Sequence, residues 1–281
     1  MVELCQDKSG INQFMVTNGY LLTPDLAYEL KKNLGLKEYQ ITLDGPPEVH
    51  DKRRIKNDGS GTFERILSNI KGILNHDDLK DIVIIIRVNI DNSNRKDFPA
   101  LLDIIEKEGI KEKIYVYPGH VKSENTTTTC VVHNCLNKRE FAEVESEMFR
   151  ELLKRGFKSL RIPRPRNTCA AVSPHTMVIG PEGEIYKCWM SVGKKEDLIG
   201  HLEDNGQCKV ENIALYLKWV NFDVLAREKC RNCKILPLCM GGCIYPEIKG
   251  EKSRECDSLK FNLEEMIKLV PLFKSVDKKF G

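Results

Sequence analysis

The stretch C-R-N-C-K-I-L-P-L-C-M-G-G-C, from Cys230 to Cys243, carries four cysteines, and Cys256 follows after twelve more residues. The spacing is C-x2-C-x5-C-x3-C…C. Thiolates are soft ligands, and a set made only of cysteines selects an iron–sulfur cluster or zinc. The C-terminal third of the chain is therefore predicted to fold around a metal.

Two further cysteines, Cys169 and Cys188, stand upstream in a C-x13-G-x4-C arrangement, so seven of the eleven cysteines form one patterned region. A [4Fe–4S] cluster takes about four thiolates, so seven cysteines predict two sites, one of them short of a protein ligand. His175 could supply that ligand, although an ordinary hairpin histidine is the simpler interpretation. The spacing favours iron–sulfur, and structural zinc stays open as an alternative.

The neighbours of these cysteines suit a cluster. Gly241 and Gly242 allow the backbone to turn tightly before Cys243 and to direct N–H groups at sulfur. Four cations near the C-x2-C pair would offset the negative charge of a thiolate-bound cluster: Arg227, Lys229, Arg231 and Lys234.

The other cysteines are less informative. Cys130 and Cys135, with His133 between them, could cap an open cluster site, bind zinc or be surface thiols, and the last is the default. Cys5 and Cys208 are most simply lone thiols.

Composition places the chain among ordinary globular proteins. Its 281 residues are 41% hydrophobic and 30% charged, and the net charge of +3 gives no reason to expect a nucleic-acid partner. The longest apolar run, residues 82–86, is too short to span a membrane, and no secretion signal opens the chain. We therefore expect a cytoplasmic protein, where thiols stay reduced and bind metal rather than form disulfides.

The first 120 residues alternate between strands and helices. Strands are predicted at residues 13–17, 39–43, 81–89 and 113–117, with helices at 24–34, 63–74 and 97–107 between them. This alternation predicts an α/β fold with about four parallel strands, part of a barrel or of an open sheet. Function in such sheets lies at the carboxyl ends of the strands.

The rest of the chain predicts a loop at 123–137, a helix at 138–155, a hairpin at 176–187, a helix at 213–226 and a closing helix at 257–272. We expect three parts: a partial barrel over 1–125, a linker loop and helix over 126–166, and a small cysteine-rich α+β domain with the hairpin over 167–281.

The full cysteine pattern, C-x13-G-x4-C…C-x2-C-x5-C-x3-C…C, resembles the SPASM domain of radical S-adenosylmethionine (SAM) enzymes that mature sulfatases and ribosomal peptides. Upstream, T-N-G at 17–19, T-L-D-G-P-P at 42–47 and H-D-K-R-R at 50–54 are similar to the middle strands of the radical SAM barrel in those enzymes. The resemblance covers nearly the whole chain.

The resemblance implies a set of cofactor ligands. Two auxiliary [4Fe–4S] clusters are implied, the first held by Cys169, Cys188 and Cys243, and the second by Cys230, Cys233, Cys239 and Cys256. The residues implied to line the SAM pocket are Thr42, Asp44, Arg54 and Arg87. The implied partners are a peptide or protein substrate and an electron donor such as ferredoxin or flavodoxin.

The chain also departs from the family. It contains no C-x3-C-x2-C, the motif whose cluster binds and cleaves SAM, and no G-G-E segment. We therefore expect a truncated radical SAM/SPASM protein that does not cleave SAM by itself. Trp189 stands where sulfatase-maturing members have an acidic residue, which favours a peptide maturase. The alternatives are a non-catalytic iron–sulfur electron carrier or peptide-binding module, and a zinc-stabilised binding protein.

Overall fold

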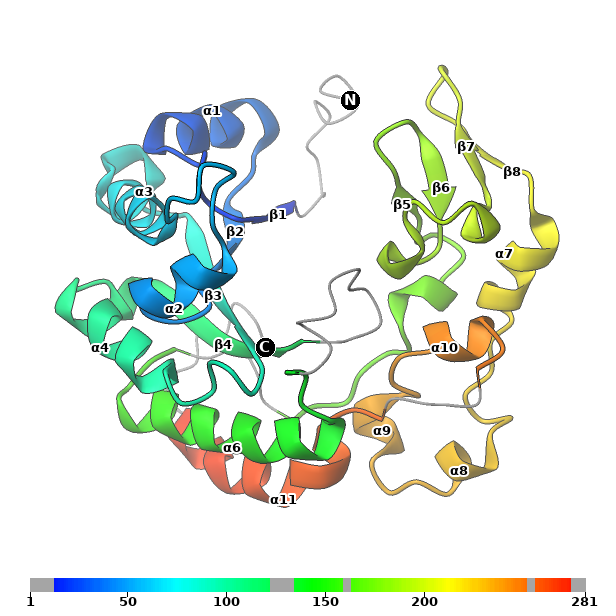
Figure 1. Ribbon diagram of the computed structural model, residues 1–281. Helices are drawn as coiled ribbons and strands as arrows, with labels where there is room; N and C mark the ends of the chain where they lie inside the picture. Colours follow the sequence, from blue (N-terminus) through cyan, green and yellow to red (C-terminus); the bar gives the residue numbers. More distant parts are fainter. Residues whose placement is uncertain (1–12, 122–133, 159–162, 252–255, 274–281) are drawn as a thin grey trace. The chain divides into compact units, whose positions relative to one another are not determined.

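A computed structural model describes residues 13–121, 134–158, 163–251 and 256–273 (Figure 1). The chain divides into two compact units, one made of residues 1–162 with 264–281 and the other of residues 163–263. Cys5, Cys130, His133 and most of the predicted loop at 123–137 lie outside the described residues. The two units are described separately below.

The first unit contains a parallel sheet of four strands in the order β1 (Phe14–Thr17), β2 (Glu38–Thr42), β3 (Val83–Ile90) and β4 (Ile114–His120). Each strand pairs with its neighbour in parallel. β3 lies inside the sheet between β2 and β4, and most of its residues are buried. The predicted α/β class and the four-stranded partial barrel are confirmed.

Helices follow the strands and cover one face of this sheet (Figure 1). They are α1 (Pro24–Leu34), α3 (Phe63–Asn75), α4 (Phe98–Lys107) and α6 (Lys138–Lys154). The side chain of Thr23 caps α1 by accepting from the Leu26 N–H, and Gly35 ends it in the left-handed conformation. The apolar sides of these helices pack on alternate strand residues such as Tyr39, Ile84 and Val116, which are fully buried.

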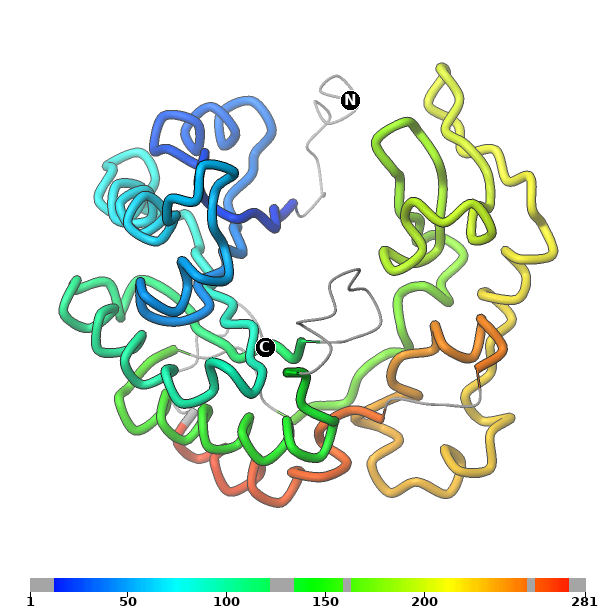
Figure 2. The backbone as a smooth tube through the Cα atoms, in the orientation of Figure 1, coloured from blue at the N-terminus to red at the C-terminus, as the bar shows by residue number. Residues whose placement is uncertain are grey.

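Several short elements complete the first unit. α2 (Pro47–Arg53) was not predicted from the sequence, although proline suits the first turn of a helix. The short helices η2 (Asp77–Leu79) and η3 (Lys111–Lys113) precede β3 and β4. At the C-terminal end, η8 (Val270–Phe273) packs beside α6, as the red and green segments of Figure 2 show.

The second unit contains an antiparallel sheet in the order β5 (Val178–Ile179), β6 (Glu184–Tyr186), β7 (Gly200–Leu202) and β8 (Cys208–Val210). β5 and β6 form the predicted hairpin. β7 and β8 were not predicted, because strands of three residues are too short to show an alternating pattern of their own.

Short helices fill the remainder of this unit. They are η5 (Ala170–Val172), η6 (Trp189–Ser191), η7 (Lys195–Asp197), α7 (Ile213–Val220), α8 (Glu228–Arg231), α9 (Leu236–Cys239) and α10 (Tyr245–Ile248). α11 (Leu259–Leu269) crosses from this unit into the first. The helix predicted to reach Ala226 ends at Val220, because the Asp223 side chain forms a turn by accepting from the Leu225 N–H.

Among the described residues, no helix combines the length and the apolar character needed to cross a membrane.

Candidate functional site

Two places in the fold gather polar or metal-binding side chains. The first lies at the carboxyl ends of β2, β3 and β4. Strand register sets Thr42 beside Arg87, and Arg87 beside Tyr117, so these residues form one row across the sheet. Thr42 is buried and Arg87 is half-buried. Both belong to the predicted SAM pocket, and the sheet brings them together.

Asp44 is the buried centre of this strand-end cluster. Its Oδ1 accepts from the Asn89 N–H at 2.9 Å, and its Oδ2 accepts from Arg54 Nε at 2.7 Å. Arg53 donates through Nη1 to Asp91 Oδ2 at 2.8 Å. Two adjacent arginines at the end of α2 are thus each held by a buried carboxylate at a strand end, which fixes the direction of both guanidinium groups.

The loop after β3 contributes residues that sequence reasoning missed. Asn94 is buried and donates through Nδ2 to the carbonyl oxygens of Asp44 and Asn89, at 2.7 and 2.8 Å. Its own Oδ1 accepts from the Asp91 N–H at 2.9 Å. Asp44 lies 50 residues from Asn94 in sequence, so only the polar composition of N-I-D-N-S-N (89–94) could have indicated this role.

His50 is buried and contacts the strand-end cluster through both ring nitrogens. Its Nδ1 accepts from the Asp44 N–H and its Nε2 lies 3.1 Å from Thr62 Oγ1, whose hydroxyl donates to the Arg54 carbonyl oxygen. Burial lowers the pKa of His50 to about 4. The ring is therefore neutral at pH 7 and carries its proton on Nε2. It positions Asp44 and Arg54 and does not present a charge to a ligand.

The face of the sheet opposite the helices carries a polar row. Arg87 Nε donates to Asn89 Oδ1 at 2.8 Å, and its guanidinium lies 6.0 Å from the centre of the Tyr117 ring. Tyr117 OH donates to Gln40 Oε1 at 2.7 Å. Arg87 also passes close to Gly119, where an added Cβ would lie 2.6 Å from Arg87 Nε. Only glycine leaves room for Arg87 in this position.

The second place is the cysteine-rich unit, where Cys169, Cys188 and Cys243 lie together. All three pack against one apolar cluster that includes Trp219 and Ile244. Burial, with smaller contributions from the neighbouring Cys169 and Cys243, raises the pKa of Cys188 to about 11. A thiol in this setting stays protonated at neutral pH without a metal, and metal binding would release its proton to solvent.

The other four cysteines of the pattern form a second group of neighbours. Burial raises the pKa of Cys230, and the nearby Cys239, Cys233 and Cys256 add to the effect. Lys260 Nζ lies 3.6 Å from Cys256 Sγ, a cation that sequence reasoning did not select. The predicted charge-balancing Arg227 instead pairs with Glu247 and stacks on Phe222, 4.3 Å from the ring centre.

A sharp turn separates the two groups. Met240, Gly241 and Gly242 follow Cys239 with φ angles of 46°, 97° and 66°. A Cβ at Gly241 would meet Val224 Cγ2 at 2.9 Å. The turn lets Cys239 join one group and Cys243 the other, although only three residues separate them.

Buried charged residues surround the first cysteine group. Lys187 donates through Nζ to the carbonyl oxygens of Ser173 and Thr176, both at 2.6 Å, and so fixes the loop that follows Cys169. Asp197 accepts from Tyr245 OH at 3.0 Å and from Lys249 Nζ at 2.7 Å, which joins the segments after Cys188 and Cys243. Sequence reasoning missed these residues because their spacing carries no motif.

The candidate ligands are of the type that iron–sulfur clusters use. All seven are cysteines without a disulfide partner. His175 is exposed on the loop between Cys169 and the hairpin. Within the described ranges, no three or more His, Cys, Asp or Glu side chains are already placed to hold a metal ion.

Comparison with known proteins identifies relatives over most of the chain, although no protein-family model matches it. The cysteine-type anaerobic sulfatase-maturating enzyme of Clostridium novyi (strain NT) is 27% identical over 256 residues, covering 83% of this chain and 64% of that enzyme. The radical SAM cyclopropyl synthase TigE of Paramaledivibacter caminithermalis is 22% identical over 281 residues, covering 93% of this chain and 55% of the synthase. The chain thus spans less than two thirds of the length of either relative.

Solved structures share the fold. The structure of anSMEcpe with bound AdoMet (SAM) matches with a TM-score of 0.63 at 17% identity, covering 95% of this chain and 73% of that chain. Streptococcus suis SuiB bound to its precursor peptide SuiA matches with a TM-score of 0.58 at 16% identity, covering 90% of this chain and 58% of SuiB. At these identities the likeness establishes the fold.

Proposed function

We propose that this chain, a relative of the radical SAM enzymes that modify peptides, binds two auxiliary [4Fe–4S] clusters and takes part in the radical modification of a ribosomal peptide or protein. The observation that carries the proposal is the sorting of seven cysteines into two groups of neighbours within one unit. A single structural zinc site would need only four of them.

Each group would hold one cluster. Cys169, Cys188 and Cys243 would bind the first, with one iron left for another ligand. Cys230, Cys233, Cys239 and Cys256 would bind the second. The clusters would supply electron transfer or a Lewis-acidic iron, and the protein's own contribution is the burial and the hydrogen bonds that fix the cysteines.

The strand-end cluster would bind SAM. The proposed lining residues are Thr42, Asp44, Arg54 and Arg87. We propose that they have different roles in binding SAM. Asp44 is buried and already bonded to protein groups, so it would position Arg54. Arg54 and Arg87 are partly exposed and offer guanidinium groups suited to a carboxylate.

The proposed partners are a peptide and an electron donor such as ferredoxin or flavodoxin. Related structures contain peptides, which supports a peptide substrate. Trp189 follows Cys188 and is 72% exposed, so an apolar side chain stands where sulfatase-maturing members carry an acid. We therefore favour a peptide maturase over a sulfatase-maturating enzyme.

Anaerobic reconstitution tests the cluster assignment. Two [4Fe–4S] clusters correspond to about eight iron and eight sulfide ions per chain with broad absorbance near 400 nm. C188A and C233A should each remove about half of the iron, whereas C208A, at an exposed cysteine outside both groups, should remove none. Colourless protein that binds zinc stoichiometrically and no iron would refute the proposal.

A second candidate, an iron–sulfur module that does not cleave SAM, is favoured by one observation. These 281 residues contain no C-x3-C-x2-C. We therefore expect the reconstituted chain to form no 5′-deoxyadenosine from SAM and dithionite on its own. Turnover by this chain would refute this second candidate. Turnover only on addition of a protein that carries C-x3-C-x2-C would identify the catalytic partner.

A further inference from the structure

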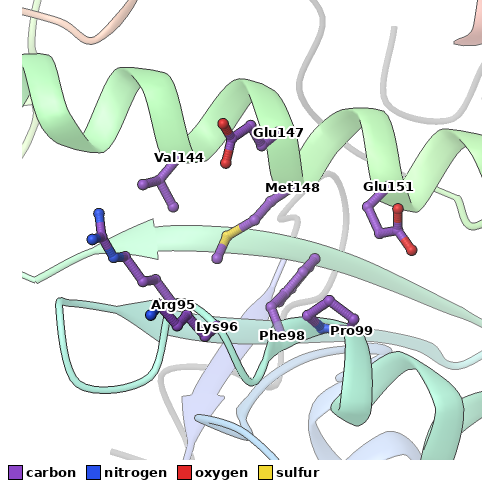
Figure 3. A pocket seen from close by; sticks show the side chains of 8 residues that line it. All are labelled: Arg95, Lys96, Phe98, Pro99, Val144, Glu147, Met148 and Glu151. Carbon is purple, nitrogen blue, oxygen red and sulfur yellow. The ribbon is translucent and has the colours of Figure 1, made fainter.

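A groove lies between the start of α4 and the middle of α6, both within the first unit (Figure 3). It encloses about 520 Å³, room for several amino-acid side chains. Its floor is apolar and made of buried side chains, namely Phe98, Val144 and Met148. We call this hollow the α4–α6 groove.

The charges on the α4–α6 groove are ordered along its length. Figure 3 shows Arg95 and Lys96 near Val144 at one end, Phe98 and Met148 in the middle, and Glu151 beside Pro99 at the other end. Glu147 projects from α6 between the ends. The groove therefore offers a positive end, an apolar middle and a negative end.

Most of these charges are available to a partner. Arg95, Lys96 and Glu147 are exposed, and no hydrogen bond or ion pair involves their side chains within the part of the chain that the structure describes. Glu151 is shared with Arg155, whose Nε lies 2.7 Å from its Oε1. Arg95 and Lys96 on one element and Glu147 on the other are unpaired opposite charges beside an apolar floor, and they are complementary to a ligand that carries both signs.

The α4–α6 groove is also connected to the strand-end cluster by one loop. Residues 91–97 join β3 to α4. On one side of this loop, Asp91 binds Arg53 and Asn94 binds the Asp44 carbonyl oxygen. On the other side, Arg95 and Lys96 line the groove. A ligand in the groove would therefore touch the loop that fixes the proposed SAM-binding residues.

We propose that the α4–α6 groove binds an extended segment of the peptide that the protein modifies. In this proposal an acidic residue of the peptide contacts Arg95 and Lys96. Apolar side chains of the peptide cover Phe98 and Met148. A basic residue of the peptide contacts Glu147 and Glu151. Val144 and Glu151 are seven helical residues apart, which is roughly 10 Å. Three extended residues span the same length, so the acidic and basic residues stand at positions i and i+3.

The identity of the ligand as substrate rests on the proposed function, whereas its binding requires neither iron nor SAM. The probe is a fluorescein-labelled peptide, Gly-Gly-Ser-Glu-Leu-Leu-Lys-Ser-Gly-Gly, followed by anisotropy with the full chain. A peptide with serine in place of both charged residues should bind at least tenfold more weakly. A peptide with lysine at both charged positions should also bind weakly.

The R95E/K96E variant separates local from general charge effects. It should weaken binding of the Glu-Leu-Leu-Lys peptide at least tenfold, and should bind the Lys-Leu-Leu-Lys peptide at least tenfold more tightly than the parent chain does. K107E/K154E changes the net charge equally at exposed lysines outside the groove, and should leave both affinities within twofold. All these residues are exposed, so the variants should fold.

Four outcomes would overturn the proposal. Equal affinity for the charged and serine peptides would exclude charge recognition. Equal losses in R95E/K96E and K107E/K154E would exclude the groove as the site. A change in the sedimentation of free R95E/K96E without a change in peptide binding would mean that a second copy of the chain occupies the groove. If the chain takes up iron but does not bind the peptide, only the groove proposal is refuted. If the chain binds the peptide but takes up no iron, only the cluster assignment is refuted.

Discussion

At the scale of single residues, His50 links the fold to the strand-end cluster and makes stability depend on pH. The folded-state pKa of about 4 lies below the value near 6.5 of an exposed histidine. Between these values the unfolded chain binds a proton that the folded chain does not, so the free energy of unfolding falls as the pH drops through this window. The loss is at most about 3–4 kcal/mol, from about 1.4 kcal/mol for each of roughly 2.5 pKa units.

The H50N variant isolates this contribution. Asn can accept from the Asp44 N–H but cannot take up a proton, so the pH dependence between about 6.5 and 4 should be flatter than in the parent chain. Urea unfolding at a series of pH values gives the comparison, and H175N at an exposed histidine is the control. Parallel pH profiles for H50N and the parent would show that burial does not lower the His50 pKa.

The absence of a side chain at Gly119 leaves room for Arg87. Variants of both residues test this contact. An added Cβ would lie 2.6 Å from Arg87 Nε, so G119A should displace Arg87 from its hydrogen bond to Asn89 and cost about 0.5–1.5 kcal/mol of unfolding free energy. In an R87A background the same change should cost much less, because the obstructing side chain is gone. A double-mutant cycle by urea unfolding measures this coupling, and additive effects would exclude the contact.

At the scale of elements, the four strands and the longer helices of the first unit could be predicted because each carries its own signal. Thr23, Pro24 and Gly35 mark the ends of α1, and the apolar run of β3 is typical of a strand buried on both faces. β7 and β8 carry no such signal, since their pairing with β6 defines them. The Arg53–Asp91 contact joins residues 38 positions apart and depends on the packed fold.

The turn at 240–242 is the element that sequence alone could not interpret fully. Cysteine spacing indicated a metal-binding region, but it did not show which cysteines lie together. The left-handed run after Cys239 directs Cys243 toward Cys169 and Cys188. Ligation itself stays a prediction.

Two matched glycine variants test this turn. G241A and G250A both place a Cβ at a positive φ, and each costs about 1–2 kcal/mol for that reason. Only at Gly241 would the Cβ also meet Val224, whereas the space around Gly250 is open. Iron content after reconstitution should fall by half or more in G241A and stay near the parent value in G250A. Equal iron content in the two variants would mean that the geometry of this turn does not control the cysteine groups.

At the scale of the whole molecule, the two units differ in what stabilises them. The first has an extended apolar core between the sheet and its helices, formed by residues such as Ile84, Phe98 and Phe149. The second has two-to-three-residue strands, short helices and a small apolar cluster around Trp219. A small core gives limited stability, so we expect the second unit to depend on its metal.

Limited proteolysis of the full chain, with iron bound and with iron removed anaerobically, tests this difference. Cleavage within residues 163–251 should accelerate at least tenfold when iron is removed, because binding to the folded state alone adds to its stability. Cleavage within residues 13–121 should change less than twofold, since that unit contains none of the seven proposed ligands. The C208A variant should follow the parent chain, whereas C233A should digest quickly even after reconstitution. Equal acceleration in both units would mean that the chain unfolds as one body, and no acceleration in either would mean that the cysteine-rich unit folds without its metal.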